Sequence, residues 1–135
     1  MKKDIDFPEV EDVAVAIAKE DKNGEEQYNV YLLNLGKQDI KNVLVSSEGY
    51  GVKPGTEEKV STSILRHFLE DVNSDEAKLI EPIMPDLFHL NNQYWVSFQK
   101  DGKTFDKKYI FVAGSVDEQF FSKLPIINAV GVIIQ

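Results

Sequence analysis

Cysteine is absent from the 135 residues of this chain. Its absence excludes disulfide bonds, thiolate ligation of metals and catalysis by a cysteine nucleophile. A domain of about this length buries roughly two-thirds of its unfolded surface, so it does not need such cross-links to be stable. We therefore expect one ordinary hydrophobic core.

Arginine is nearly absent, since Arg66 is the only one, and acidic residues outnumber basic ones by 23 to 15. Nucleic-acid binding depends on lysine and arginine surfaces, and arginine supplies the bidentate fork that recognises phosphate. The net charge of −8 also repels phosphate. We expect no nucleic-acid ligand, unless Lys100, Lys103, Lys107 and Lys108 form one contiguous patch.

Long apolar runs are absent as well. Residues 1–8 contain two lysines but no apolar segment of the kind that a secretory signal needs. The apolar tail, Leu124–Ile134, is too short for a membrane span and is interrupted by Asn128 and Gly131. The sequence predicts a cytoplasmic protein that does not contact a membrane.

The strongest structural signal lies within Gln93–Val112, where two runs rich in β-branched and aromatic residues flank Asp101-Gly102. An Asp-Gly pair accepts positive φ at both turn positions and is typical of a two-residue hairpin loop. Such a loop pairs Lys100 with Lys103, and the register of the whole hairpin follows from that pair.

This register predicts two different faces for the hairpin. One face carries cross-strand aromatic pairs, which contribute roughly 0.2–1 kcal/mol each before burial is counted, and we expect it to lie in the core. The other face is polar, apart from one large aromatic side chain, and we expect it to be solvated. The core pairs are Phe98–Phe105 and Tyr94–Tyr109, and the solvated pairs are Trp95–Lys108 and Ser97–Asp106.

Turn signals at 10–15-residue spacing divide the rest of the chain into short strands. Residues 13–18 alternate valine or isoleucine with alanine, which predicts a strand with one β-branched face and one small-residue face. Alanine also favours helix, but Asn23-Gly24 follows and favours a hairpin. Further strands are predicted over residues 27–35, 40–47, 60–72, 77–83 and 130–134.

Three segments are less regular. The apolar residues of the predicted strand 60–72 also fit a short helix. The segment Gly49–Gly55 is a loop by composition. Near the C-terminus, Ser115 and Glu118 have the spacing of a capping box, which predicts one or two helical turns that end before Pro125.

These elements predict an all-β fold, an immunoglobulin-like antiparallel β-sandwich of about seven strands with one short C-terminal helical turn, in a single domain over residues 1–135. The segment Val30–Gly36, followed by Ile40–Val45, resembles accessory immunoglobulin-like domains built around an asparagine-leucine-glycine strand end. Trp95 lies in the sixth predicted strand rather than the third, and the Cys–Trp–Cys arrangement of antibody domains is missing. The resemblance is therefore one of architecture.

A second resemblance covers the full length of the chain. Seven short strings resemble a small bacterial family of single-domain proteins of this size, some of which are labelled as related to phenylalanyl-tRNA synthetase. Class II synthetases hold ATP and the activated amino acid with two motif arginines, and Arg66 alone cannot supply both. We therefore transfer no synthetase activity. The strings are Lys2–Ile5, Pro8–Val10, Leu65–His67, Leu90–Asn92, Phe105–Lys108, Leu124–Ile126 and Gly131-Val132.

No motif for a cofactor or metal is complete. Asp71–Asp75 resembles the start of a calcium loop, but Glu76 stands where glycine is required and Pro82 where glutamate is required. The glycines of Gly49–Gly55 match neither a dinucleotide fingerprint nor a phosphate-binding loop. We expect turns at both places, with no cofactor and no metal.

The two histidines are weak candidates for catalysis. His67, beside Phe68, is more typical of a half-buried imidazole with one hydrogen bond than of a general base. Zinc would require His67 and His89 to converge with carboxylates. The strained Gly-x-Ser-x-Gly turn of serine hydrolases is also absent. We expect no enzymatic activity.

Binding candidates remain. Trp95 opposite Lys108 is either buried between sheets or shielded by the lysine stem, or it is an exposed aromatic anchor, a residue type enriched at binding surfaces. The apolar tail, with Phe120 and Phe121 before it, either covers the sandwich or leaves a patch that requires a partner or a dimer mate.

We therefore expect a non-catalytic module that binds a protein partner or a second copy of itself. The main alternative is a small-ligand or carbohydrate binder that uses Tyr50, Trp95 and the Asn91-Asn92 loop. A metal-dependent enzyme built on both histidines is a further, weaker hypothesis.

Overall fold

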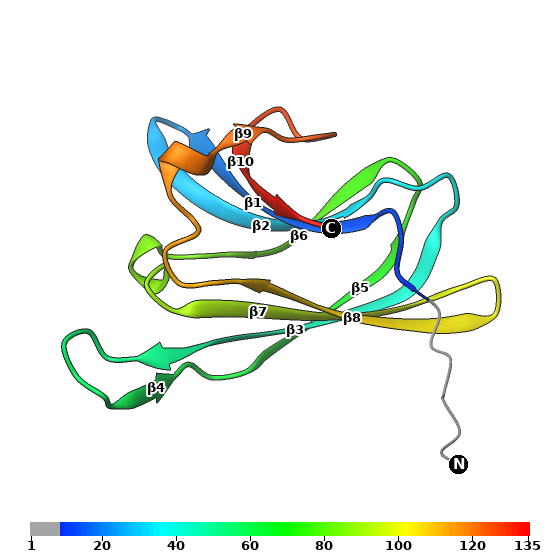
Figure 1. The fold of residues 1–135 in the computed structure, drawn as a ribbon. Helices are drawn as coiled ribbons and strands as arrows, with labels where there is room; N and C mark the ends of the chain where they lie inside the picture. The colour runs from blue at the N-terminus through cyan, green and yellow to red at the C-terminus, as the bar shows by residue number, and fades with distance from the viewer. Residues whose placement is uncertain (1–8) are drawn as a thin grey trace, which may run out of the picture.

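The computed structural model describes residues 9–135, in which two antiparallel sheets pack face to face (Figure 1). The first sheet has the order β6-β2-β1-β10-β9, and the second has the order β4-β3-β7-β8, with β5 also paired to β3. The predicted all-β sandwich is therefore confirmed. The strings at Lys2–Ile5 and Pro8 lie outside the described residues. The elements are β1 Val13–Lys22, β2 Glu25–Asn34, β3 Ile40–Val52, β4 Lys59–Ser61, β5 Leu65–Val72, β6 Glu76–Pro82, the 3₁₀ turn η1 Pro85–Leu87, β7 Asn91–Lys100, β8 Lys103–Phe111, η2 Glu118–Phe120, β9 Ser122–Lys123 and β10 Val130–Ile134.

The strand connections follow the immunoglobulin pattern. Strands β1, β2 and β6 occupy the places of A, B and E, and strands β5, β3, β7 and β8 occupy those of C′, C, F and G. Strands β9 and β10 extend the first sheet beyond β1, and β4 lengthens one edge of the second. The described residues therefore form ten strands rather than about seven.

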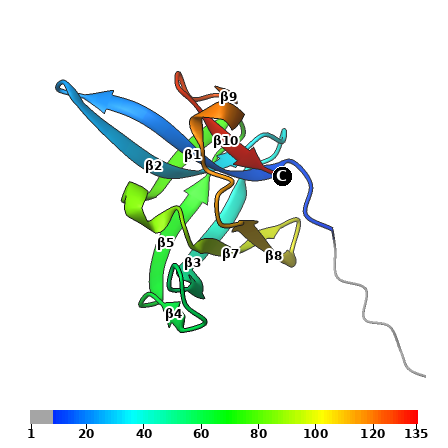
Figure 2. The same ribbon diagram turned by 60° about the vertical axis from the view of Figure 1, so that its left-hand side comes forward.

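Both predicted hairpins are present. Asn23 and Gly24 have φ of 56° and 81° between β1 and β2, and this hairpin extends beyond the sandwich (Figure 2). Asp101 and Gly102 have φ of 54° and 73°, and Lys100 pairs with Lys103. Both pairs of positive φ match the turn type that closes two-residue hairpins.

The segment Gly49–Gly55, predicted to be a loop, is a strand as far as Val52. Gly49 and Gly51 lie in this strand, where a Cβ would be 3.2 Å from Thr62 and 3.2 Å from Leu90, respectively, whereas Gly55 has a φ of 77° and turns the chain beyond it. The predicted strand 60–72 is divided into β4 and β5. The division falls where Thr62 Oγ1 accepts a hydrogen bond from the backbone N–H of Gly49, at 2.9 Å.

The predicted capping box is also wrong. The Ser115 hydroxyl donates to the carbonyl of Val112, and the N-cap is Asp117, whose carboxylate accepts from the N–H of Gln119. A single turn follows, as few as the prediction allowed, and it is a 3₁₀ turn. The hydrogen bond between Asp117 and the N–H of Gln119 spans two residues, whereas the predicted capping box between Ser115 and Glu118 spans three. The shorter-range side-chain bond forms here in place of the predicted one.

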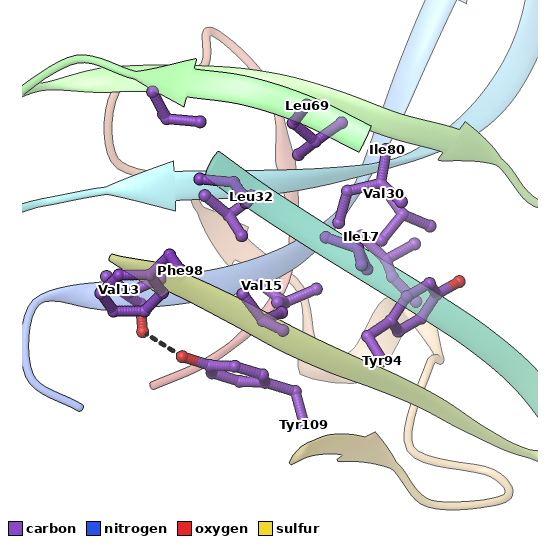
Figure 3. Close-up of a cluster of buried hydrophobic side chains, with 14 of the residues drawn as sticks. Val13, Val15, Ile17, Val30, Leu32, Leu69, Ile80, Tyr94, Phe98 and Tyr109 are labelled. Atoms are coloured by element: carbon purple, nitrogen blue, oxygen red, sulfur yellow. Dashed lines mark hydrogen bonds between the residues drawn. The ribbon is translucent and has the colours of Figure 1, made fainter. Parts of the chain in front are cut away.

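The core lies between the sheets, and β1 contributes to it with its β-branched face (Figure 3). Val13, Val15 and Ile17 pack there, and the Tyr109 hydroxyl donates to the carbonyl of Val13 at 2.8 Å. The alanine face of the same strand is also fully buried, in a cluster with Leu124, and Ile127 and Ile133 of the C-terminal segment are partly buried against it. Small side chains on this face let the segment lie close to the sheet, so most of the tail covers the sandwich.

Candidate functional site

The outward side of the second sheet carries apolar and cationic side chains that are open to solvent. The register places Leu44 beside Phe68 and Ser97, and it places Ser46 between Arg66 and Trp95. We call this surface the outer sheet face. It consists of Leu44 and Ser46 on β3, Arg66 and Phe68 on β5, Trp95 and Ser97 on β7, and Asp106, Lys108 and Ile110 on β8.

Trp95 lies near the middle of the outer sheet face and is 43% exposed. The Nζ atom of Lys108 lies 4.7 Å from the centre of its ring, within the range of a cation–π interaction. The predicted register therefore gave the right neighbour for Trp95. The tryptophan is not buried between the sheets; it is partly exposed, and the Lys108 side chain lies over its ring.

A shallow depression of about 270 Å³ adjoins this tryptophan. Leu44 and Trp95 supply apolar surface to it, while Arg66 and Asp106 supply opposite charges. The lysines of the β7–β8 hairpin do not gather here, because Lys108 contacts Trp95 and Lys107 lies over Tyr109, which belongs to the core.

The other residues of the small-ligand hypothesis lie away from Trp95. Tyr50 pairs with Asn91 at the far end of β3 and β7, four residues along the strand from Trp95. Asn92 is buried, and its amide donates to the carbonyls of Leu87 and Leu90. The side-chain oxygen of Asn91 accepts from the N–H of Ala113. Both asparagines therefore fix the end of the hairpin.

The two phenylalanines before the tail flank the first sheet. Phe121 packs edge-on against Tyr28, with ring centres 6.3 Å apart, whereas Phe120 is exposed. The seven candidate binding residues thus do not form one site. Trp95 and Lys108 share the outer sheet face, and the other five lie at other places on the domain.

A hydrogen-bonded cluster of polar side chains lies between the sheets, and the sequence analysis did not predict it. Glu81 on β6 reaches across from the first sheet, and three side chains of the second sheet bind its carboxylate. The hydroxyl of Ser47 donates to Oε1 at 2.9 Å, Nε2 of His67 lies 2.8 Å from the same oxygen, and the hydroxyl of Tyr94 donates to Oε2 at 3.0 Å. His67 therefore has the single hydrogen bond expected from sequence.

Burial fixes the protonation state of the tyrosine in this group. Tyr94 is 1% exposed, and this burial, together with the charge of Glu81 and the hydrogen bond to it, raises the pKa of Tyr94 well above its usual value. The hydroxyl therefore remains a donor to the carboxylate. A side chain of the first sheet is thereby tied to three of the second.

These side chains line what we call the inter-sheet cleft, a cavity of about 420 Å³. Ser47 donates to Glu81 rather than to His67, so these side chains do not form the Ser–His pair of a serine hydrolase. His89 is held apart by a hydrogen bond from Nδ1 to the carbonyl of Asp86. Within residues 9–135, no three histidine, aspartate or glutamate side chains are grouped so that they could hold a metal ion.

The hydrogen bonds that join Glu81 of the first sheet to the second sheet lead to a stability prediction. Tyr94→Phe removes a donor to a largely buried carboxylate, and we expect it to lower the free energy of unfolding by about 1.5–2 kcal/mol, the range for hydrogen bonds to charged groups. Tyr31→Phe is the matched control, because its hydroxyl donates to the carboxylate of Glu20, at 2.6 Å, on a more open surface. We expect it to cost less than about 1 kcal/mol. Urea unfolding of both variants measures the difference, and an equal loss would contradict the assignment.

Comparison of the chain with models of known protein families and with curated proteins finds no match. No helix in the described part of the chain is long and apolar enough to cross a membrane.

Proposed function

We propose that this domain is a non-catalytic interaction module that binds a protein partner through the outer sheet face. The observation that carries the proposal is the exposure of Leu44, Phe68, Trp95 and Ile110 on one continuous sheet surface. Soluble monomers rarely leave large contiguous apolar patches open, and tryptophan and arginine are the residue types most enriched at binding hot spots.

The charges on this face suggest the chemistry of the partner. Of the nine residues of the outer sheet face, Arg66 and Lys108 are cationic and Asp106 is anionic, so this face carries a net positive charge on a chain whose net charge is −8. Charge complementarity then favours a partner that offers an apolar side chain to the depression beside Trp95 and acidic groups around it.

The same charges weigh against self-association through this face. In a symmetric dimer, each copy would present the same patch to the other. The net positive charge of one copy's face would then lie against the same charge of the other copy, and like charges brought together are unfavourable. We therefore propose that the partner is a different protein rather than a second copy of this chain. Sedimentation of the purified domain as a dimer would count against this proposal.

Site-specific photo-crosslinking tests the proposal. A photoreactive phenylalanine analogue replaces Phe68 on the outer sheet face or, as the control, Leu79, which is exposed on β6 of the other sheet. In native lysate we expect one stoichiometric protein adduct from position 68 and none from position 79.

Trp95→Ala in the position-68 protein should abolish the adduct. Because Trp95 is the only tryptophan, its fluorescence should also shift to shorter wavelength when the captured partner is added to the unmodified domain. An adduct from position 79 alone, or one that persists in Trp95→Ala, would place the binding surface elsewhere.

A further inference from the structure

The inter-sheet cleft lies on the inner side of the second sheet, and the proposed protein interaction does not use it. Its volume of about 420 Å³ falls within the range of 300–1,000 Å³ found for small-molecule sites. The titratable residues that line it are Glu48, Glu81, His67 and Tyr94, and of these His67 is charged only when protonated. No lysine or arginine of residues 9–135 lines this cavity.

The carboxylate of Glu81 has room for one more hydrogen bond. A carboxylate offers about four acceptor positions. Oε1 uses two of them for Ser47 and His67, and Oε2 uses one for Tyr94. Two of these donors are hydroxyl groups, and the third is a neutral imidazole unless it is protonated. They hold the carboxylate in place without cancelling its charge.

Apolar side chains lie beside this charge and are open to solvent. Leu65 and Met84 line the cleft and are 50% and 66% exposed, and Ile83 and Leu87 add apolar surface. A ligand that covers these side chains gains the free energy of apolar burial. A ligand with a positive charge at one end also makes a charge-assisted hydrogen bond to Oε2.

We propose that the inter-sheet cleft binds a small organic cation, an ammonium group attached to an apolar body. The ammonium donates to Oε2 of Glu81, and the body packs on Leu65 and Met84. The acidic charge of the whole chain adds a long-range attraction for such a ligand. This proposal does not depend on the protein partner, since the outer sheet face and the cleft lie on opposite sides of the second sheet.

Three probes that share one ring and differ in charge test the proposal: 2-phenylethylamine, 2-phenylethanol and 3-phenylpropionate. Titrations at pH 8, where imidazoles are typically neutral, are followed by amide chemical shifts of the intact domain. We expect the amine to saturate residues that line the cleft, the alcohol to bind at least about tenfold more weakly and the anion not to bind. Equal affinity of amine and alcohol would overturn the proposal. A lysine amide that binds more tightly than the amine would assign the cleft to a peptide side chain instead and would also overturn it.

Two variants distinguish the contribution of the Glu81 charge to binding from that of the apolar side chains that line the cleft. Glu81→Gln keeps the shape of the side chain and removes its charge. It should therefore weaken binding of the amine at least about tenfold and leave the affinity for the alcohol unchanged. Met84→Ala alters an exposed side chain, so we expect the domain to remain folded. This variant should weaken binding of the amine and of the alcohol to the same extent. Glu25→Gln removes one negative charge near the tip of the β1–β2 hairpin and should change neither affinity. Amine binding to Glu81→Gln that matches the unmodified domain would refute the site.

Discussion

Gly131→Ala is expected to lower the free energy of unfolding by about 3 kcal/mol or more, at the upper end of what overpacking costs. A Cβ at this position would lie 2.0 Å from the carbonyl oxygen of Ile17 and 3.0 Å from Cα of Ala18. Both atoms belong to the backbone of β1 and cannot rotate away. Strand β10 would have to move off β1, and the C-terminal segment that covers the alanine face would move with it.

The matched control is another glycine inside a strand. Gly51→Ala places a Cβ 3.2 Å from Cδ2 of Leu90, the mobile end of a side chain. We expect a loss below about 1 kcal/mol, because that methyl group can shift by a few tenths of an ångström. Urea denaturation compares the two variants. Equal losses would show that β10 does not lie as close to β1 as the structure places it.

The β7–β8 hairpin could be predicted from the sequence because its information is local. Asp101-Gly102 determines the turn type, the turn determines the register, and the register assigns each side chain to a face. The structure confirms every step, including the stack of Phe98 on Phe105, whose ring centres are 5.1 Å apart. The register assigns Trp95 to the solvated face, but it leaves open whether the side chain itself is covered, because that depends on whether another segment packs on that face.

The Glu81 group could not be predicted for a related reason. Its partners are 34, 14 and 13 residues away along the chain, on strands of the opposite sheet. Alternation within β6 shows that the glutamate lies in a strand, but it does not show which strand faces it. The loop prediction for Gly49 and Gly51 was wrong for the same reason: composition suggests a turn, and only the closely packed Thr62 and Leu90 show how glycine fits into a strand here.

Phe98→Ala is expected to lower the free energy of unfolding by about 3–5 kcal/mol, the usual cost of removing a buried aromatic ring. The side chain is 1% exposed and lies nearly parallel to Phe105, with 8° between the ring planes. Such a loss is a large share of the roughly 5–15 kcal/mol that stabilises a typical domain. Thermal and urea unfolding measure it, and a double-mutant cycle with Phe105→Ala should give a coupling of about 0.5–1.5 kcal/mol for the pair.

Phe68→Ala is the control that connects this prediction to the proposed function. Phe68 is 58% exposed on the outer sheet face, so its removal should change the free energy of unfolding by no more than about 0.5 kcal/mol. It should weaken partner binding, because the side chain belongs to the exposed apolar surface. Phe98→Ala should do the reverse and leave binding intact wherever the domain is still folded. A Phe68→Ala domain that loses stability but keeps its partner would mean that this aromatic is retained for the fold, and the outer sheet face would lose its main support as a binding surface.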